Sequence, residues 1–199
     1  MALTTTDRVL AEIVAPKEGS ALLLKQAALV VLGILAMTLA AKARIPMWPV
    51  PITMGTFAIL TIGAAYGPRL GLTTILGYLV IGALGFDVFA GSSAESNGIS
   101  YMLGGTGGYL VGYVLATLAL GAAARAGWDR SVVKMAAAML IGNVLIYIPG
   151  LLWLGQLFGW DQPILQWGLT PFLIGDALKL ALAALLVPAV WKFVGNART

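Results

Sequence analysis

The feature that most constrains this chain is a series of long apolar runs, each about 17–25 residues in length, the length an α-helix needs to cross a hydrocarbon core of roughly 30 Å. Inside a bilayer every backbone polar group must find its partner within the protein, which a helix achieves within its own segment. The sequence therefore predicts an all-α integral membrane protein.

The polar composition supports this fold class and excludes several functions. Charged residues make up 10% of the chain and hydrophobic residues 60%, whereas a soluble domain carries about 25% charged residues. The chain has no cysteine, which excludes disulfides and thiolate chemistry, and no histidine, which removes the commonest general base and metal ligand. We expect neither an enzyme nor a bound cofactor.

We expect about six transmembrane helices in one compact bundle. Residues 1–20 form a cytoplasmic tail or a short interfacial helix that ends before Pro16, and residues 21–199 form the transmembrane domain. The sequence "YGPRLG" predicts a tight hairpin, with Gly67 closing one helix and Pro68 opening the next. The expected spans are 21–41, 50–66, 68–85, 104–125, 131–154 and 171–194.

The basic residues predict the orientation in the membrane. An even number of spans brings both termini to one side, and nine of the twelve bases fall on that side. The opposite loops contain only Lys42 and Arg44, so we expect a multi-pass protein of the bacterial cell membrane with both termini in the cytoplasm. The nine are Arg8, Lys17, Lys25, Arg69, Arg125, Arg130, Lys134, Lys192 and Arg198.

The longest connections lie on the other, outer side. They cover residues 42–50, 86–105 and 155–170, whereas the inner connections are short. Long loops without regular structure are uncommon in a small protein and are usually functional. A binding site is therefore expected at the outer end of the bundle.

Two charges interrupt the last apolar run. Asp176 lies about five residues into this span, a depth of roughly 8 Å, and Lys179 lies one turn deeper on the same face. Charged side chains that face lipid carry a high free-energy cost, so we expect both to face the bundle interior. They form either a salt bridge that joins helices or a polar binding site open to the outside, and the second interpretation is favoured.

Other polar and aromatic side chains are expected near this pair. Each also has a structural interpretation, as an interfacial aromatic or an interhelical hydrogen bond. Together they predict an apolar pocket with aromatic walls and a few polar groups, the usual form of a small-molecule site. The candidates are Thr53 and Thr56, Asn143 and Tyr147 on one helix face, and Arg44, Trp48, Asn97 and Tyr101 from the loops.

The glycine-rich stretch "GGTGGYLVGY" is not a phosphate-binding loop, because it lacks the lysine and the following hydroxyl residue of that motif. Gly104, Gly108 and Gly112 recur every four residues, which is typical of closely packed membrane helices. The chain therefore contains no visible ATPase.

Several segments resemble the BioY family, the biotin-binding S-components of energy-coupling-factor (ECF) vitamin transporters. They are "ARIPMWPVPITMGTFAIL", "GAAYGPRLG", "GALGFDVFAG", "GGTGGYLVGY" and "GDALKLALAALLVP", in the same order over about residues 40–190. The resemblance implies a six-helix protein that captures biotin from outside, in a site covered by its first and third loops. It also implies a separate transmembrane coupling protein and two ABC-type ATPases.

The resemblance also implies roles for individual residues. Asp176 and Lys179 match the charged pair of the last helix and would bind the ureido ring of biotin. Arg44, Asn97 and Tyr101 resemble loop residues near the ligand, with the partner of the valerate carboxylate left open. Ala36 and Ala40 have the spacing of the family's Ala-x-x-x-Ala coupling motif, although they lie toward the outer end of their span.

The sequence therefore predicts a high-affinity biotin-binding membrane subunit. An S-component for another vitamin, and a stand-alone facilitator or channel, are the alternatives. We expect lipid and the coupling subunits as partners and no nucleic acid. Whether the chain forms a homo-oligomer is left open.

Overall fold

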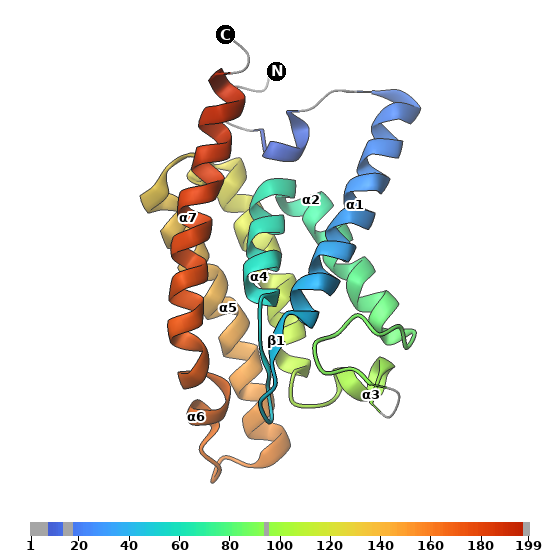
Figure 1. Ribbon diagram of the computed structural model, residues 1–199, viewed down its shortest axis with the longest axis vertical. Coiled ribbons are helices and arrows are strands. Elements are labelled where there is room, and N and C mark those ends of the chain that lie inside the picture. The colour runs from blue at the N-terminus through green and yellow to red at the C-terminus, as the bar shows by residue number, and fades with distance from the viewer. Residues whose placement is uncertain (1–7, 14–17, 94–95, 197–199) are drawn as a thin grey trace.

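The computed structural model describes residues 8–13, 18–93 and 96–196, and its elements are almost all helices (Figure 1). Five segments of the described chain are long and apolar enough to span a membrane. They are α1 (Gly19–Lys42), α2 (Gly55–Ala83), α4 (Gly107–Arg125), α5 (Val132–Phe158) and Ile164–Val194, which contains α6 (Ile164–Gly168), η4 (Thr170–Phe172) and most of α7 (Leu173–Asn196). The remaining elements are η2 (Leu10–Glu12), α3 (Gly98–Met102), η3 (Trp128–Arg130) and the antiparallel strands β1 (Arg44–Ile45) and β2 (Ile52–Thr53).

The element α2 consists of two helices joined at Gly67. This residue has φ 76° and ψ 178°, a conformation that a side chain would strain, and Pro68 follows it. A methyl group placed on Gly71 would lie 3.6 Å from the Cα of Gly63, whereas these positions are about 12 Å apart along a straight helix. The chain therefore reverses at Gly67, which confirms the predicted hairpin and divides α2 in two, so that the five apolar segments of the described chain contain six long helices.

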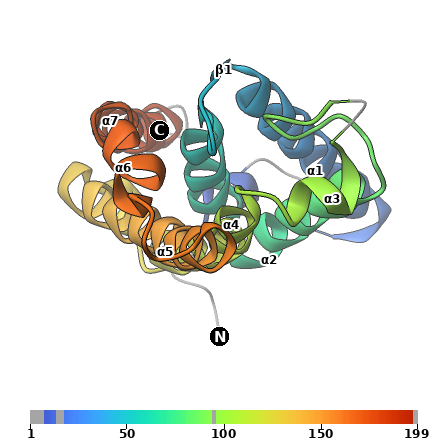
Figure 2. The ribbon, with the colours of Figure 1, turned by 90° about the horizontal axis from the view of Figure 1, so that it is seen from below.

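The helix α4 lies in the middle of the bundle, between α2 and α5 (Figures 1 and 2). Its glycines permit this position: a Cβ at Gly112 would meet the Cα of Ile146 at 2.6 Å, and Gly108 approaches Pro149 and Trp153 of α5. The predicted close packing at Gly108 and Gly112 is confirmed. The expectation for Gly104 is wrong, because it precedes α4 and its carbonyl accepts a hydrogen bond from Trp153 Nε1 at 2.8 Å.

The outward faces of the long helices are apolar and exposed. Val133, Ile174 and Phe193 each expose more than three quarters of their side chains. In water such a surface would be an aggregation hazard, whereas in a bilayer it is solvated by acyl chains. These faces fit a multi-pass membrane protein.

The two ends of the bundle differ. The element η2 and the last turns of α7 lie at one end, and the β1–β2 hairpin, α3 and α6 lie at the other (Figure 1). In the N-terminal segment, Leu10–Glu12 form a short 3-10 turn, and Val9 is buried against Gly67. The rest of the expected interfacial helix, with Lys17 and Arg198, lies outside the described residues.

Candidate functional site

A cavity of about 60 Å³ lies at the end of the bundle that carries the β1–β2 hairpin and α3. Its wall combines the second half of α1, both halves of α2, the middle of α5, the first two turns of α4 and α7, and the neighbouring loops. The wall is largely apolar and aromatic, with polar groups gathered at Asp176. The lining residues include Met37, Ala41, Val50, Pro51, Thr53, Thr56, Tyr78, Phe89, Ala90, Tyr101, Thr106, Tyr109, Tyr113, Ile146, Tyr147, Phe172, Asp176 and Lys179.

Asp176 and Lys179 form a buried ion pair in this wall. The side chains expose 6% and 12% of their surface, and Lys179 Nζ lies 2.9 Å from Asp176 Oδ1. Asp176 lies in the first turn of α7, which begins at Leu173, so it is nearer the helix end than the sequence predicted. The positive end of the helix dipole favours a carboxylate there.

Neighbouring helices complete the hydrogen bonding of the pair. Lys179 Nζ donates to the Thr53 carbonyl at 2.6 Å, to Thr56 Oγ1 at 3.2 Å and to Asp176, so each ammonium proton has an acceptor. Asp176 also accepts from the hydroxyls of Thr56, at 3.0 Å, and Tyr147. The pair thus joins α7 to α2 and α5 and presents a satisfied polar cluster to the cavity.

Tyrosines form much of the remaining wall, and sequence reasoning identified only Tyr101 and Tyr147 among them. Tyr109 and Tyr113 share one face of α4, and Tyr78 comes from the second half of α2. The i, i+4 spacing of Tyr109 and Tyr113 was the available signal. The face toward which this pair points depends on how α4 is rotated, which the sequence pattern does not specify.

Thr106 presents an unusual polar atom to the cavity. Its Oγ1 is buried and has no hydrogen-bond partner among the described residues. A buried hydroxyl without a partner is destabilising, and such groups in native proteins commonly have a functional explanation. The geometry leaves this oxygen available to a ligand.

Two loops close the cavity and are tied together. Lys42 Nζ, at the end of α1, bonds Asp87 Oδ1 at 2.5 Å and the carbonyl of Phe89 at 2.9 Å. The Lys42 hydrogen bond holds the pKa of the Asp87 carboxyl below its usual range. Ser92 Oγ donates to the same carboxylate, and the Tyr101 hydroxyl accepts from the Gly91 N–H at 3.1 Å.

Four predicted site residues do not line the cavity. Arg44 is exposed at its rim, where its guanidinium donates to the carbonyl of Ala90, and Asn97 is at the N-cap position of α3 without a side-chain capping hydrogen bond. Trp48 is 67% exposed and packs on Phe158 and Trp167, with ring centroids 5.3 and 5.0 Å apart.

Asn143 is the fourth of these residues. It shares a face of α5 with Tyr147 but lies one turn deeper, and its Oδ1 is buried without a hydrogen-bond partner among the described residues. Of the two predicted coupling residues, Ala36 is exposed on α1, and Ala40 is half-buried against the core.

The fold and the cavity define a class: a helical membrane protein of several spans with a cavity at one end. The BioY family model matches residues 11–196, and the chain belongs to this family. A probable biotin transporter BioY of Pyrococcus horikoshii is 35% identical over 162 residues, 81% of this chain and 93% of that protein. The biotin transporter BioY of Thermotoga maritima is 30% identical, over 71% of this chain and 81% of its own.

A solved structure shares the fold. It is the crystal structure of the S-component for biotin from an ECF-type ABC transporter, with a TM-score of 0.72 and 21% identity. The match covers 88% of this chain and 95% of the other. The predicted fold class and family are therefore confirmed, and the named relatives are transporters rather than enzymes.

Proposed function

We propose that this chain is the membrane subunit that binds biotin for uptake, in the cavity between α1, α2, α4, α5 and α7. The observation that carries the proposal is the polar cluster of Asp176, Lys179, Thr56 and Tyr147 at one end of an aromatic cavity. The names of the relatives in Pyrococcus and Thermotoga support biotin as the ligand.

The cluster has the chemistry that a cyclic urea requires. A ureido ring presents N–H donors beside a carbonyl acceptor, and the bound ring needs partners for both kinds of group. Asp176 supplies carboxylate oxygens for an N–H. Lys179, Thr56 and Tyr147 supply donors for the carbonyl when the ligand takes the place of one of their present acceptors. The aromatic residues of the wall pack against the apolar part of the ligand. Thr106 Oγ1 supplies a further hydrogen bond.

The other end of the ligand is a carboxylate, and Arg44 is the cation we assign to it. Arg44 lies at the cavity rim beside Ala90, and a Cβ on Gly91 would lie 3.7 Å from Arg44 Nη1 and 3.4 Å from the Tyr101 hydroxyl. Tyr101 and Asn97 belong to the same closing loop. In this proposal Trp48 and Asn143 support the site from outside the cavity wall.

The proposed direction of uptake follows from the basic residues. In this proposal the end of the bundle that carries the cavity faces the outside, and both termini lie in the cytoplasm. A separate ECF coupling protein and ABC-type ATPases supply the energy, because the sequence has no phosphate-binding loop of its own. We assign the contact with the coupling protein to the outer face of α1, where Ala36 is exposed and Ala40 lies one turn away.

The function can be tested by asking which small molecule remains bound when the protein is purified. The protein is extracted in detergent from cells grown with a mixture of vitamins, denatured, and its ligand is identified by mass spectrometry. The proposal predicts biotin in near-stoichiometric amount, and an Asp176→Asn variant prepared in parallel should retain less of it. Recovery of a different vitamin would assign the cavity to that molecule, and recovery of none from a folded protein would contradict tight binding.

A further inference from the structure

The Tyr109 side chain lines the cavity and also reaches the segment that leads into α7. Its hydroxyl donates to the Gly168 carbonyl at 2.8 Å, and both residues are buried. Gly168 is the last residue of α6, which lies at this end of the bundle between α5 and α7 (Figure 2). The hydrogen bond therefore joins the start of α4 to the chain just ahead of Asp176.

Among the described residues, this is the hydrogen bond that ties residues 164–172 to another helix. The other hydrogen bonds of the segment are local, such as the one from the Thr170 hydroxyl to the Leu165 carbonyl at 3.1 Å. Trp167 contributes ring contacts with aromatic neighbours instead. Hydrogen bonds have a preferred direction, whereas apolar packing has little. The Tyr109 hydroxyl is thus the directional contact that fixes where this segment lies.

The surrounding backbone leaves room for this side chain and little more. A Cβ at Gly150 in α5 would lie 2.6 Å from the Tyr109 ring, and a Cβ at Gly168 would overlap the Tyr109 hydroxyl. Glycine at both positions lets the ring pack on one backbone and the hydroxyl approach the other. A tyrosine held this closely keeps one orientation, so the carbonyl that it binds is held in one place.

The Tyr109 ring also supports a partner of the Asp176 carboxylate. The rings of Tyr109 and Tyr147 meet edge to face, with centroids 6.2 Å apart and planes at 86°. Tyr147 donates its hydroxyl to Asp176, and its ring centroid lies 6.4 Å from that of Phe172 in η4. Tyr109 therefore acts on the carboxylate by two routes, through Tyr147 and through the segment that precedes α7.

We propose that Tyr109 is a positioning residue for the ureido site: its hydroxyl, through Gly168, fixes the start of α7 and so the place of the Asp176 carboxylate. Groups that bind a ligand must be held within about 0.5 Å of their productive positions by the residues that support them. This role rests on the proposed function, because the place of the carboxylate matters to a ligand that bonds it.

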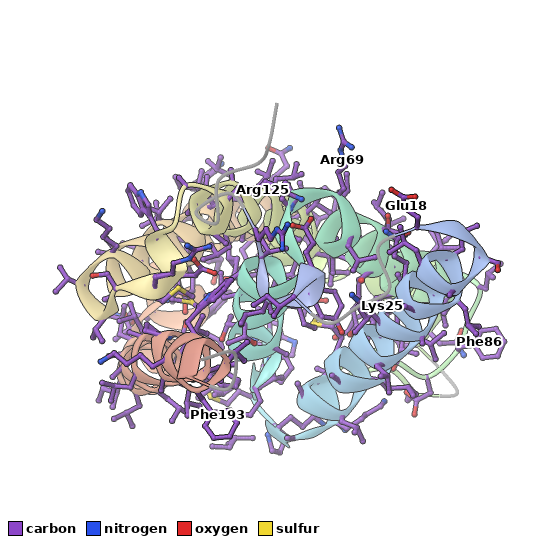
Figure 3. The ribbon with its side chains drawn as sticks, turned by 90° about the horizontal axis from the view of Figure 1, so that it is seen from above. Glu18, Lys25, Arg69, Phe86, Arg125 and Phe193 are labelled. Carbon is purple, nitrogen blue, oxygen red and sulfur yellow. The ribbon has the colours of Figure 1, made fainter. Side chains whose placement is uncertain are left out.

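Two tyrosine-to-phenylalanine variants make a matched pair for the test. Tyr109→Phe removes the hydroxyl and keeps the ring with its packing. Tyr66→Phe also removes a hydroxyl that bonds a carbonyl, that of Leu29 at 3.0 Å, and Tyr66 does not line the cavity. Tyr66 directly precedes the Gly67 reversal, at the end of the bundle that Figure 3 shows, where Arg69 is labelled.

Biotin titrations measure the effect on the site. We expect Tyr109→Phe to weaken biotin binding at least fivefold and Tyr66→Phe to stay within twofold of wild type, although each loses one hydrogen bond. Gly168→Ala, whose methyl group displaces the Tyr109 hydroxyl, should reproduce the loss. Full affinity in either cavity variant would overturn the proposal. Equal losses in Tyr109→Phe and Tyr66→Phe would show general loosening of the bundle and would overturn it as well.

A double-mutant cycle separates positioning from direct contact between the Tyr109 hydroxyl and the ligand. If Tyr109 acts through the carboxylate, Tyr109→Phe should cost less than twofold in the Asp176→Asn background, because the group that it positions has been replaced. A full fivefold loss in that background would show that the two residues act independently. That result would overturn the role assigned to the hydroxyl.

Hydrogen exchange of the empty protein tests the same contact without biotin. Backbone amides of residues 164–176 should exchange at least threefold faster in Tyr109→Phe than in wild type, and Tyr66→Phe should leave them unchanged. Unchanged exchange in Tyr109→Phe would overturn the proposal even where biotin binds. If the exchange rises as expected but wild type binds no biotin, the proposed function fails while the positioning of α7 by Tyr109 stands.

Discussion

Asp176 and Lys179 form hydrogen bonds to other residues as well as to each other, so substituting either one removes several contacts at once. A buried ion pair is weak evidence for stability, since matched apolar residues often replace it without loss, whereas removing one partner costs about 3–5 kcal/mol. Here Thr53, Thr56 and Tyr147 also bond the pair. A single substitution therefore changes both the fold and the site, and the two effects must be measured separately.

We predict that Asp176→Asn weakens biotin binding at least tenfold, about 1.4 kcal/mol, because the amide replaces one acceptor oxygen by a donor. Lys179→Met should lower both stability and affinity. The double variant Asp176→Leu/Lys179→Met should recover stability without recovering binding. Thermal melts without biotin measure the stability of each variant, and biotin titrations measure its affinity. Full affinity in a stable double variant would leave the pair with a structural role only.

Asp129 is a second buried acid, in the connection between α4 and α5. Its side chain is fully buried, and its Oδ2 accepts from Trp191 Nε1 at 2.5 Å. Burial raises the pKa of Asp129 to about 6, although the Trp191 hydrogen bond and nearby Arg130 act in the opposite direction. A carboxyl with a raised pKa binds its proton more tightly in the folded state. It therefore makes the protein less stable as pH rises from about 4 to about 6.

The variant Asp129→Asn should remove this pH dependence while keeping an acceptor for Trp191. Wild type should lose roughly 2 kcal/mol more than the variant between pH 4 and pH 7, most of the free energy that corresponds to a shift of about two pKa units. Denaturant unfolding in detergent across this range measures the difference. Parallel curves for the two proteins would show that Asp129 does not titrate in this interval.

At the scale of the helices, α4 depends on close approach to α5 and α2. The glycines of α4 let its backbone approach the neighbouring helices closely where they cross. In lipid there is no hydrophobic effect between helices, so close packing of this kind drives their association. Gly112 and Gly175 form a matched pair of helical glycines for testing this. A Cβ at Gly112 would meet Ile146 Cα at 2.6 Å, whereas a Cβ at Gly175 in α7 would meet nothing within 4 Å.

We predict opposite results for Gly112→Ala and Gly175→Ala. Alanine is the better helix former by about 1 kcal/mol, so Gly175→Ala should be neutral or slightly stabilising. The same change at Gly112 forces the backbones of α4 and α5 apart and should cost about 1–3 kcal/mol. Melting temperatures of the two variants in one detergent decide the matter. Equal stabilities would mean that the helices do not need this contact.

The helices were predictable because the bilayer imposes their length and composition. The Gly67–Pro68 hairpin was also predictable, since only glycine tolerates the backbone conformation at that reversal. The residues of the cavity wall were less predictable. Tyr147 and Asn143 share a face at i, i+4, yet Tyr147 reaches Asp176 while Asn143 lies about 6 Å deeper along the helix. Whether Tyr109 and Tyr113 face the ligand depends on helix rotation, which hydropathy does not encode.

At the scale of the whole molecule, the proposed function separates the capture of biotin from the supply of energy for its uptake. The cavity lies at one end, closed by loops that Lys42 and Asp87 tie together, and the described ends of the chain lie at the other. Vesicles that contain this chain alone should show no ATP hydrolysis and no accumulation of biotin above the outside concentration. Adding a coupling protein and its ATPases should restore both. Concentrative uptake by the chain alone, without an ion gradient, would contradict the proposed division of labour.

The central claim is that the cavity at Asp176 is a high-affinity biotin site. Titration calorimetry of biotin into the purified, ligand-free protein tests it most directly. The account predicts one site per chain with a dissociation constant in the nanomolar range, about −12 kcal/mol, because a largely enclosed ring would have its hydrogen bonds satisfied. Binding only at millimolar biotin, in a protein that melts cooperatively, would contradict it.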